Sequence, residues 1–329
     1  MTSRKNVIWP VLKQVFILVV SLFVLSILVF YISRMTPTDP LQSYYGERVE
    51  KMSVEEKQQA REKLGLDDSV SVQYVRWLGN AFRGDFGISY KYKQNVLDVI
   101  WLRLPNTLLL GGTGFVLVFT GALILGSLCA WYENRWVDKV LCKLGTLVSC
   151  IPEFWLSLVL IFVFSVILRW LPVSGAYSVG QNKSIADRLV HLILPLVVVV
   201  TGHLWYYAYM VRNKLLEEIR MDYVTLARVK GLKDVQILFR HCLRCVMPSY
   251  LSMMAISVPH ILGGTYIVEM VFSYPGVGTL AYESARYADY NMLMVICLLT
   301  GAVVMVCSMI AQKINEWINP RMQSGEVKS

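Results

Sequence analysis

Hydrophobic residues are grouped into six continuous stretches, which cover residues 15–33, 104–132, 144–168, 189–211, 245–268 and 290–312. A helix that crosses a bilayer needs about 20 residues, and each stretch is close to that length or longer. Five contain no Lys, Arg, Asp or Glu, and the third contains one acid, Glu153, directly after Pro152. Because the apolar residues do not alternate with polar ones over short segments, they predict helices rather than a strand barrel. The pattern therefore predicts an all-α polytopic membrane protein with six transmembrane helices.

The composition supports a membrane protein and changes how its charge is interpreted. The 329 residues are 55% hydrophobic and 17% charged, and the mean hydropathy of +0.49 is too high for a soluble globule. A net charge of +9 could suggest nucleic acid as a partner. In a membrane protein, however, basic residues lie in cytoplasmic loops and face anionic lipid. We therefore expect a lipid bilayer, and no nucleic acid, as the partner of this charge.

The positions of Lys and Arg predict the orientation. If the N-terminus is inside, the inside segments hold Arg4, Lys5, Lys13, Arg135, Lys139, Lys143, eight basic residues between 212 and 244, Lys313, Arg321 and Lys328. The short outside loops hold only Arg169, Lys183, Arg188 and Arg286. Basic residues concentrate on the cytoplasmic side, so both termini are predicted to be cytoplasmic. None of the seven cysteines lies in an outside segment, so no disulfide framework is expected.

The first stretch is predicted to be a retained helix and to lead into a long outside segment. Its apolar core is longer than the roughly 7–15 residues of a signal-peptide core, and no small-residue cleavage site follows it. In the outside segment, Ser53 and Glu56 form a capping-box pattern, and a short helix over 55–64 would end at Gly65. A second amphipathic piece covers 73–78, and GDFG at 84–87 reads as a turn. Two roles stay open: a cap over the helix ends, or a vestibule wall that meets a partner or substrate.

The inside segment after the fourth stretch carries charge and a glycine at its centre. The pattern predicts a helix from Asp222, a turn at Gly231, and a second helix over 235–246 with Asp234 as its N-cap. Pro248 would then lie at the start of the fifth membrane helix. A simple loop would need far fewer residues. The segment is either an amphipathic helix on anionic lipid or a docking element for a soluble cytoplasmic partner.

The chain lacks the motifs of an ATP-binding or catalytic protein. A phosphate-binding loop reads GxxxxGK[ST], and the nearest match, GALILGS at 121–127, has no Lys and lies in an apolar helix. If ATP drives this protein, another chain must bind it. No Ser/His/Asp or paired-carboxylate arrangement appears, so we expect a non-catalytic subunit. An ion-coupled carrier would pair its buried ionisable residues, whereas Glu153 has no Lys or Arg nearby in its helix.

Three residues of the apolar stretches are candidates for a translocation pathway: Glu153, His203 and His260. Polar residues within membrane helices usually face protein or a cavity, although Glu153 beside Pro152 could instead be structural. Met210, Met253 and Met254 are on the same two helices as the histidines, a composition that suits a soft metal ion. The spacing matches no ligand motif, and the single CxxC at 242–245 has no second pair. No metal site and no cofactor is therefore predicted.

The motifs, in order, resemble one known family. They are LGLD (64–67), QY and WL (73–78), GDFG (84–87), RLPNTL (103–108), WLP (170–172) with Gly175, DYV (222–224) with ARVKG (227–231), His241, Leu243, Arg244, VE (268–269) with Phe272, PGVG (275–278), DY (289–290) and NPR (319–321). Each motif is short, but their order and spacing extend nearly from end to end. The chain resembles the inner-membrane permease subunit of bacterial ABC importers for dipeptides, oligopeptides and nickel.

The resemblance implies a type I ABC importer permease fold in the bacterial plasma (inner) membrane. It also implies a heterodimer with a second, similar permease, two cytoplasmic ABC ATPases and an extracytoplasmic substrate-binding protein. The chain would divide into a first helix with an extracytoplasmic segment (1–103), an ABC transmembrane type-1 domain (104–314) and a cytoplasmic tail (315–329). The ATPases would dock on a coupling segment, 217–248. Its expected contact residues are Asp222, Tyr223, Ala227, Arg228, Lys230, Gly231, Leu232, His241, Arg244 and Pro248.

Several alternatives stay open. The general ABC permease signature has Glu-Ala-Ala, then Gly after three residues, whereas this chain has Thr225, Leu226, Ala227 and then Gly231. From Gly231 to Pro248 the segment is one residue shorter than the family pattern, so the contacts of its second half should differ. The substrate is either a di- or oligopeptide, or nickel or a metal chelate. More remote alternatives are an ion-coupled carrier, which would work without ATPases, and a membrane sensor, which would transport nothing.

Overall fold

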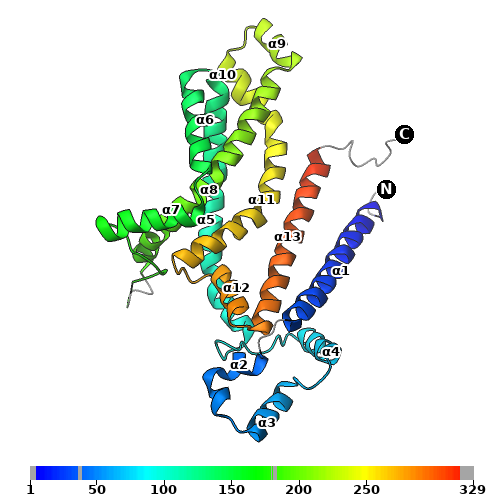
Figure 1. Cartoon of the computed structure of the whole chain (residues 1–329). Helices are drawn as coiled ribbons and strands as arrows, with labels where there is room; N and C mark the ends of the chain where they lie inside the picture. Colours follow the sequence, from blue (N-terminus) through cyan, green and yellow to red (C-terminus); the bar gives the residue numbers. More distant parts are fainter. Residues whose placement is uncertain (1–4, 36–38, 179, 181–183, 319–329) are drawn as a thin grey trace. The chain divides into compact units, whose positions relative to one another are not determined.

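A computed structural model describes residues 5–35, 39–178, 180 and 184–318, and side chains within 12–314 of these (Figure 1). The chain forms two compact units. Unit 1 comprises Met1–Pro105 and Pro275–Val306, and unit 2 comprises Asn106–Tyr274 and Cys307–Ser329. The motif at 319–321, Arg4, Lys183, Lys328 and most of the predicted tail (315–329) lie outside the described residues.

Five helices in the described part of the chain are long and apolar enough to cross a membrane, and a bent helix pair brings the number of possible spans to six. The five are α1 (Lys5–Met35), α5 (Val96–Trp131), α8 (Ile185–Ile219), α11 (Leu243–Val271) and α13 (Tyr290–Ile318). They coincide with the first, second, fourth, fifth and sixth apolar stretches. The predicted all-α membrane fold is confirmed.

The third apolar stretch, predicted as one helix over 144–168, is bent. It contains the end of α6 (Trp136–Ser149), then α7 (Glu153–Leu160), which continues as the π-helix η2 (Ile161–Ile167). The two parts meet at an angle of 94° (Figure 1). Pro152 is the cause, because the residue before a proline avoids helical backbone angles and Pro152 itself is extended, with φ −62° and ψ 137°. Hydropathy shows an apolar stretch but not this change of direction.

The predicted separation between a cytoplasmic helix over 235–246 and a membrane helix starting near Pro248 is wrong. α10 (Asp234–Gln236), the π-helix η3 (Ile237–Cys242) and α11 follow one another without a break and form one apolar helix, Asp234–Val271. Pro248 lies inside α11. A membrane helix tolerates an internal proline when neighbouring groups satisfy the freed backbone carbonyl. The inside segment is therefore continuous with the fifth span.

Unit 1 also contains the helices of the predicted outside segment. They are α2 (Pro40–Tyr45), the 3₁₀ helix η1 (Gly46–Lys51), α3 (Val54–Leu64) and α4 (Val70–Ala81). Unit 1 further contains α12 (Val277–Arg286), which lies between α11 and α13 in the sequence. The predicted capping box is confirmed: Ser53 Oγ accepts from the backbone N–H of Glu56, and the Glu56 carboxylate accepts from that of Ser53. Gly65 ends α3 with φ +65°. Tyr74 of α4 is buried in a cluster with Phe30 and Met294.

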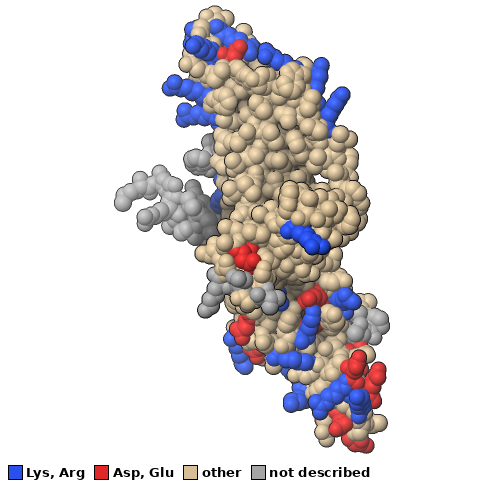
Figure 2. All heavy atoms as spheres, turned by 90° about the vertical axis from the view of Figure 1, so that its left-hand side faces the viewer, with Lys and Arg blue, Asp and Glu red and all other residues tan. Residues whose placement is uncertain are grey.

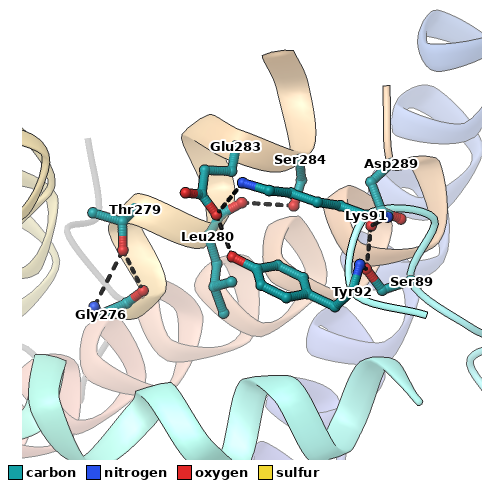
Figure 3. A network of polar contacts seen from close by, with 9 residues as sticks. All are labelled: Ser89, Lys91, Tyr92, Gly276, Thr279, Leu280, Glu283, Ser284 and Asp289. Atoms are coloured by element: carbon teal, nitrogen blue, oxygen red, sulfur yellow. Dashed lines mark hydrogen bonds and ion pairs between the residues drawn. The ribbon is translucent and has the colours of Figure 1, made fainter. Parts of the chain in front are cut away.

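A polar network in unit 1 joins the loop before α5 to α12 and to the residue before α13 (Figure 3). Asp289, which is 1% exposed, accepts a hydrogen bond from the Ser89 hydroxyl and another from the Lys91 backbone N–H at 3.2 Å. Glu283 pairs with Lys91 Nζ at 2.9 Å and accepts from the Tyr92 hydroxyl. Each carboxylate therefore has a polar partner, which a half-buried or buried charge requires.

The protonation of this network follows from burial and its hydrogen bonds. Burial alone would raise the pKa of Glu283, but hydrogen bonds from Tyr92 and Lys91 outweigh it and hold the pKa below its ordinary value. Burial, then the hydrogen bond to Glu283, raises the pKa of Tyr92 to about 12. A carboxyl whose pKa is lowered by folding stabilises the protein above its unfolded pKa, and this contribution is lost as pH falls through the folded pKa.

Replacing Glu283 with Gln should lower the free energy of unfolding by about 1 kcal/mol at neutral pH, because it removes the ion pair with Lys91. The loss is no larger because solvent partly screens this pair. The thermal midpoint of the detergent-solubilised protein measures this change. The gap between wild type and Glu283→Gln should shrink below the ordinary Glu pKa as the carboxyl becomes protonated. A gap that stays constant down to strongly acidic pH would contradict the assigned ion pair.

Unit 2 is held together by close helix packing. A Cβ on Gly114, Gly121 or Gly126 of α5 would lie 2.7–2.9 Å from atoms of α8. These glycines therefore let the two helices approach closely, as small residues do in membrane helices. A large buried cluster runs through unit 2 and includes residues of α5, α8, η3 and α11. The unit is thus one packed body, within which the candidate site can be described.

Candidate functional site

A cavity of about 980 Å³ lies between α8 and α11 in unit 2. His203, Met210 and Lys214 mark its extent along α8, and His260 and Ser249 mark it along α11. Besides apolar side chains, its wall carries hydroxyl groups, which belong to Tyr206, Tyr207, Ser249, Tyr250, Ser252 and Ser257. Ligand cavities combine apolar walls with a few such polar groups. The two histidines predicted to line a pathway lie on the wall of the same cavity.

The third predicted pathway residue, Glu153, is next to His203. Its Oε1 atom is 3.7 Å from His203 Nδ1, and both side chains are mostly buried. His203 Nδ1 also lies 3.0 Å from the backbone carbonyl of Val199, one helical turn earlier. The bend at Pro152 starts α7 at Glu153, which brings a carboxylate to a histidine fifty positions later in the chain. The structure thus gives Glu153 a partner that its own helix lacks.

Two glycines make room for this pair. A Cβ on Gly202 would lie 2.4 Å from Glu153 Oε1, and a Cβ on Gly264 would lie 2.6 Å from His203 Cε1. Real Cβ atoms do not approach other atoms so closely, so any larger residue at either position would displace the pair. Gly263, the neighbour of Gly264, has no atom within 4 Å of a built Cβ. Gly202 of α8 and Gly264 of α11 therefore leave the space that Glu153 and His203 occupy.

Among the described residues, Glu153, His203 and His260 do not form a three-residue group of possible metal ligands. Met210 and Met253 line the cavity. Among the described residues, however, the three-residue group of His, Cys, Asp and Glu side chains close enough to hold an ion is elsewhere, at Cys129, Asp138 and Cys142. Hydroxyl, imidazole and thioether groups spread along a wall suit a polar organic molecule with several contacts.

The inside segment forms a compact helical turn at one end of unit 2, where α8 ends and α10 begins (Figure 1). α9 (Asp222–Val229) follows α8 after a two-residue break. Its inner face carries Val224 and Ala227, which are buried in the same cluster as Ile237 and Leu238 of η3. Because both faces of this contact are apolar and dry, α9 is packed against the chain rather than lying free.

The turn after α9 depends on Gly231 and an ion pair. Gly231 has φ +79°, a left-handed conformation that glycine adopts without strain, and its backbone N–H donates to the Arg228 carbonyl at 2.9 Å. Arg228 Nε donates to Asp234 Oδ1 across the turn at 3.0 Å. Tyr223 donates to the Glu218 carboxylate at 2.8 Å, and burial raises the pKa of Tyr223 above its ordinary value, so it remains a donor.

The outer face of α9 and its turn is exposed and mixes apolar with basic residues. Leu226 is 55% exposed, Val229 80% and Leu232 38%, and Lys230 and Lys233 are exposed beside them. Figure 2 shows Lys and Arg side chains gathered over this end of unit 2. An exposed apolar face rimmed by charge is typical of interaction surfaces.

The predicted coupling residues separate into two sets. Eight are exposed on or near this outer face: Asp222, Tyr223, Arg228, Lys230, Gly231, Leu232, His241 and Arg244. Ala227 is buried in the inner face and Pro248 is half-buried inside α11. Tyr223, His241 and Arg244 also share a pocket of about 250 Å³ with Arg240 and Cys245. Ala227 therefore lies beneath the surface rather than in it, and Pro248 belongs to α11.

Two buried polar pairs were not predicted. Arg212 donates to both oxygens of Asp138 at 2.7 Å, and Thr107 donates to the fully buried Glu269 at 2.7 Å. Asp138, Arg212 and Glu269 lie outside the apolar stretches, where a charge looks like part of a polar loop. Thr107 lies near the start of the second stretch. The longer helices seen in the structure bring them inside. Sequence patterns contain no signal that joins positions so far apart.

Family models cover most of the chain. A model described as the binding-protein-dependent transport system inner membrane component matches residues 122–324. A model of the N-terminal part of this membrane component matches residues 8–111. The chain therefore belongs to the family of binding-protein-dependent transport system inner membrane components. It is the permease subunit of an ABC importer, a multi-pass and non-catalytic protein of the bacterial inner membrane.

Curated relatives align over nearly their whole length. The chain is 34% identical to the oligopeptide transport system permease protein AppB of Bacillus subtilis (strain 168), over 91% of this chain and 94% of that protein. It is 31% identical to the glutathione transport system permease protein GsiC of Escherichia coli (strain K12), over 95% and 98%. It is also 32% identical to a putative peptide permease protein of Brucella suis biovar 1, over 92% and 95%.

A solved structure supports the fold. The chain resembles a protein chain in the inward-facing MetNI methionine ABC transporter with a TM-score of 0.51 and 16% identity. The match covers 66% of this chain and 97% of that chain. At this identity the likeness concerns the fold alone, and it agrees with the predicted type I importer permease architecture.

The glycine pair on α11 provides a matched test of the Glu153–His203 site. Gly264→Ala should displace the His203 ring, cost about 1–3 kcal/mol in local packing and reduce transport. Gly263→Ala has open space and should leave transport near wild type. The measurement is substrate uptake by cells that contain equal amounts of membrane-inserted protein. Equal uptake by the two variants would show that transport does not depend on the position of the His203 ring.

Proposed function

We propose that this chain forms half of the translocation pathway of an ATP-driven importer for di- or oligopeptides. The observation that carries the proposal is the near full-length similarity to permeases named for oligopeptide and glutathione transport. The cavity between α8 and α11 is consistent with it, because hydroxyl groups on an apolar wall can accept and donate hydrogen bonds along a peptide. Substrate would move past His203 and His260, with Glu153 behind His203.

The energy for transport would come from two cytoplasmic ATPases that dock on the outer face of α9. In the proposed orientation this end of unit 2 is cytoplasmic. α9 connects to α8 on one side and to the continuous helix Asp234–Val271 on the other, and these two elements line the cavity. A push on α9 would therefore be transmitted to both cavity walls. Asp222, Lys230, Gly231, Leu232, His241 and Arg244 supply the proposed contacts, with Ala227 beneath them.

The remaining partners belong to the same proposal. A second, similar permease would supply the other half of the pathway, and an extracytoplasmic binding protein would deliver the substrate. The outside segment, with α2, α3 and α4, is the part of residues 1–103 that would face this binding protein. We propose three parts along the chain. They are residues 1–103, a transmembrane domain over 104–314 that contains the coupling segment 217–248, and a cytoplasmic tail over 315–329.

Nickel or a metal chelate is the second candidate substrate. It is favoured by the imidazole groups of His203 and His260 and the thioether groups of Met210 and Met253 on one cavity wall. Among the described residues, the two histidines belong to no three-residue group of His, Cys, Asp and Glu ligands, so a free ion would have few such ligands here, whereas a chelate would carry its own. The cavity thus favours a peptide, or a metal complex of similar polarity, over a bare ion.

Uptake measurements separate these substrates and the two remote classes. Cells with and without the gene are given a labelled dipeptide or labelled nickel. The proposal predicts gene-dependent dipeptide uptake that disappears when the partner ATPases are deleted. Gene-dependent nickel uptake alone would replace peptide with metal as the substrate. Uptake that persists without the ATPases would indicate an ion-coupled carrier, and no uptake of either would indicate a non-transporting sensor.

The Gly231 turn offers a second test, of coupling itself. Gly231→Pro removes the N–H that bonds Arg228 and cannot adopt φ +79°, so it should distort the docking surface. Gly231→Asn is the matched control, since Asn tolerates the left-handed region and the space around Gly231 is open. A loss of about 1.4 kcal/mol in the free energy of ATPase docking raises the dissociation constant about tenfold. Gly231→Pro should therefore reduce uptake by at least that factor, while Gly231→Asn transports normally.

Ala227→Glu examines the inner face of α9 in the same assay. It places a charge in the buried cluster and should also abolish coupling while the protein stays inserted in the membrane. Membrane insertion is measured by the amount of full-length protein in washed membranes. Wild-type uptake by Gly231→Pro or Ala227→Glu would contradict the docking of the ATPases on α9.

A further inference from the structure

A cluster of two thiols and a carboxylate lies outside the transport cavity. Cys129 comes from α5, and Asp138 and Cys142 come from one face of α6, four residues apart. The thiol sulfurs and a carboxylate oxygen of this trio all lie within 4.8 Å of one another. Cys129 and Asp138 are buried and Cys142 is half-buried. This arrangement has no role in the proposed transport mechanism.

The carboxylate is held in a fixed orientation. Asp138 Oδ1 accepts from Arg212 Nε at 2.7 Å and from the Cys142 thiol at 3.3 Å. Asp138 Oδ2 accepts from Arg212 Nη2 at 2.7 Å and from the Asn134 backbone N–H at 3.0 Å. Three of these four bonds come from groups that keep their protons. The fourth comes from a thiol, whose proton can be replaced by a metal ion.

We propose that Cys129, Asp138 and Cys142 form a site for a thiophilic divalent cation, with Zn²⁺ as the ion that fits best. Zn²⁺ binds thiolate sulfur at about 2.3 Å and carboxylate oxygen at about 2.0–2.2 Å. Such bonds place tetrahedral ligand atoms about 3.5–4 Å apart, so small side-chain rotations close the observed trio around an ion. The ion takes the place of the Cys142 proton between sulfur and Asp138 Oδ1.

The charges balance when the ion binds. Without metal, the negative charge of Asp138 is offset by Arg212 and both thiols are neutral. On binding, the two thiol protons leave to solvent, and the two thiolates offset the charge of Zn²⁺. No net charge is added to a buried place, which would otherwise be costly. Arg212 becomes the outer partner that orients the ligating carboxylate, an arrangement common at metal sites.

The fourth coordination position faces a cavity. Cys129, Cys142 and Arg212 line a cavity of about 410 Å³ at the surface of α6 and α8, which gives the ion a path and a place for a water ligand. In the proposed orientation this end of α5 is cytoplasmic, where thiols stay reduced and are available to a metal. Because Arg212 belongs to α8, a bound ion would tie together α5, α6 and α8.

Cobalt titration tests the site directly. The full-length chain, co-purified in reduced form with its partner subunits, is titrated with Co²⁺, which reports thiolate ligands through a charge-transfer absorption band. We expect the band in wild type and its loss on adding Zn²⁺. Cys129→Ser and Cys142→Ser should each abolish it. Cys150→Ser, which changes an exposed cysteine on the same cavity, and Cys245→Ser are matched controls that should keep it.

A second measurement on the unmodified sequence covers the case in which a serine variant misfolds. Zn²⁺ should slow alkylation of Cys129 and Cys142 in wild type, measured by peptide mass mapping, and leave alkylation of Cys150 unchanged. The proposal is overturned if wild type shows no thiolate band, if Cys150→Ser or Cys245→Ser abolishes it, or if a Cys129–Cys142 disulfide forms in place of a bound ion.

Discussion

The burial of one face of α9 is the contact on which the proposed coupling mechanism depends. Val224 and Ala227 belong to the same dry cluster as Ile237, Leu238 and Leu215, and burying a side chain the size of valine contributes about 1.5–3 kcal/mol. This contact holds a short helix, too short to be stable alone, firmly between α8 and the helix that becomes α11. Without it, force applied to α9 would bend a loop. With it, we propose, the same force would reach both walls of the cavity.

Three carboxylates of unit 2 have polar partners, as a bilayer, which offers no water to unpaired polar groups, requires. Glu153 has His203, Asp138 has Arg212, and Glu269 has Thr107. Each pair links two different helices, so polar groups that would be costly alone become cross-links. The glycines of α5 and the pair Gly202 and Gly264 let the helices come close enough for these contacts. Packing and polar satisfaction therefore act together to set the shape of the transport cavity.

Much of the fold could be predicted from the sequence because hydropathy and capping act locally. The five long spans, the capping box at Ser53 and the end of α3 at Gly65 follow from neighbouring residues. The chain bends by 94° at Pro152, whereas Pro248 lies inside the continuous helix α11. Proline favours a break at both positions, and the sequence does not show at which of them neighbouring groups satisfy the freed backbone and let the helix continue. The site shows the same limit. His203 and His260 were expected to face protein, but the partner of Glu153 and the pair of Asp138 and Arg212 join positions distant in the chain, which only folding brings together.

The central claim is that movement of α9 opens and closes the cavity between α8 and α11. The most direct measurement uses Ile256→Cys, an exposed cavity-lining position, in a chain whose exposed Cys150 and Cys245 are replaced by serine. The complete importer is reconstituted, and the rate of thiol alkylation at position 256 is compared with and without a nucleotide that closes the ATPases. The account predicts a clear change in rate between the two states, and loss of that change with Gly231→Pro. An alkylation rate that is the same with and without nucleotide, in an importer that still transports, would contradict this account.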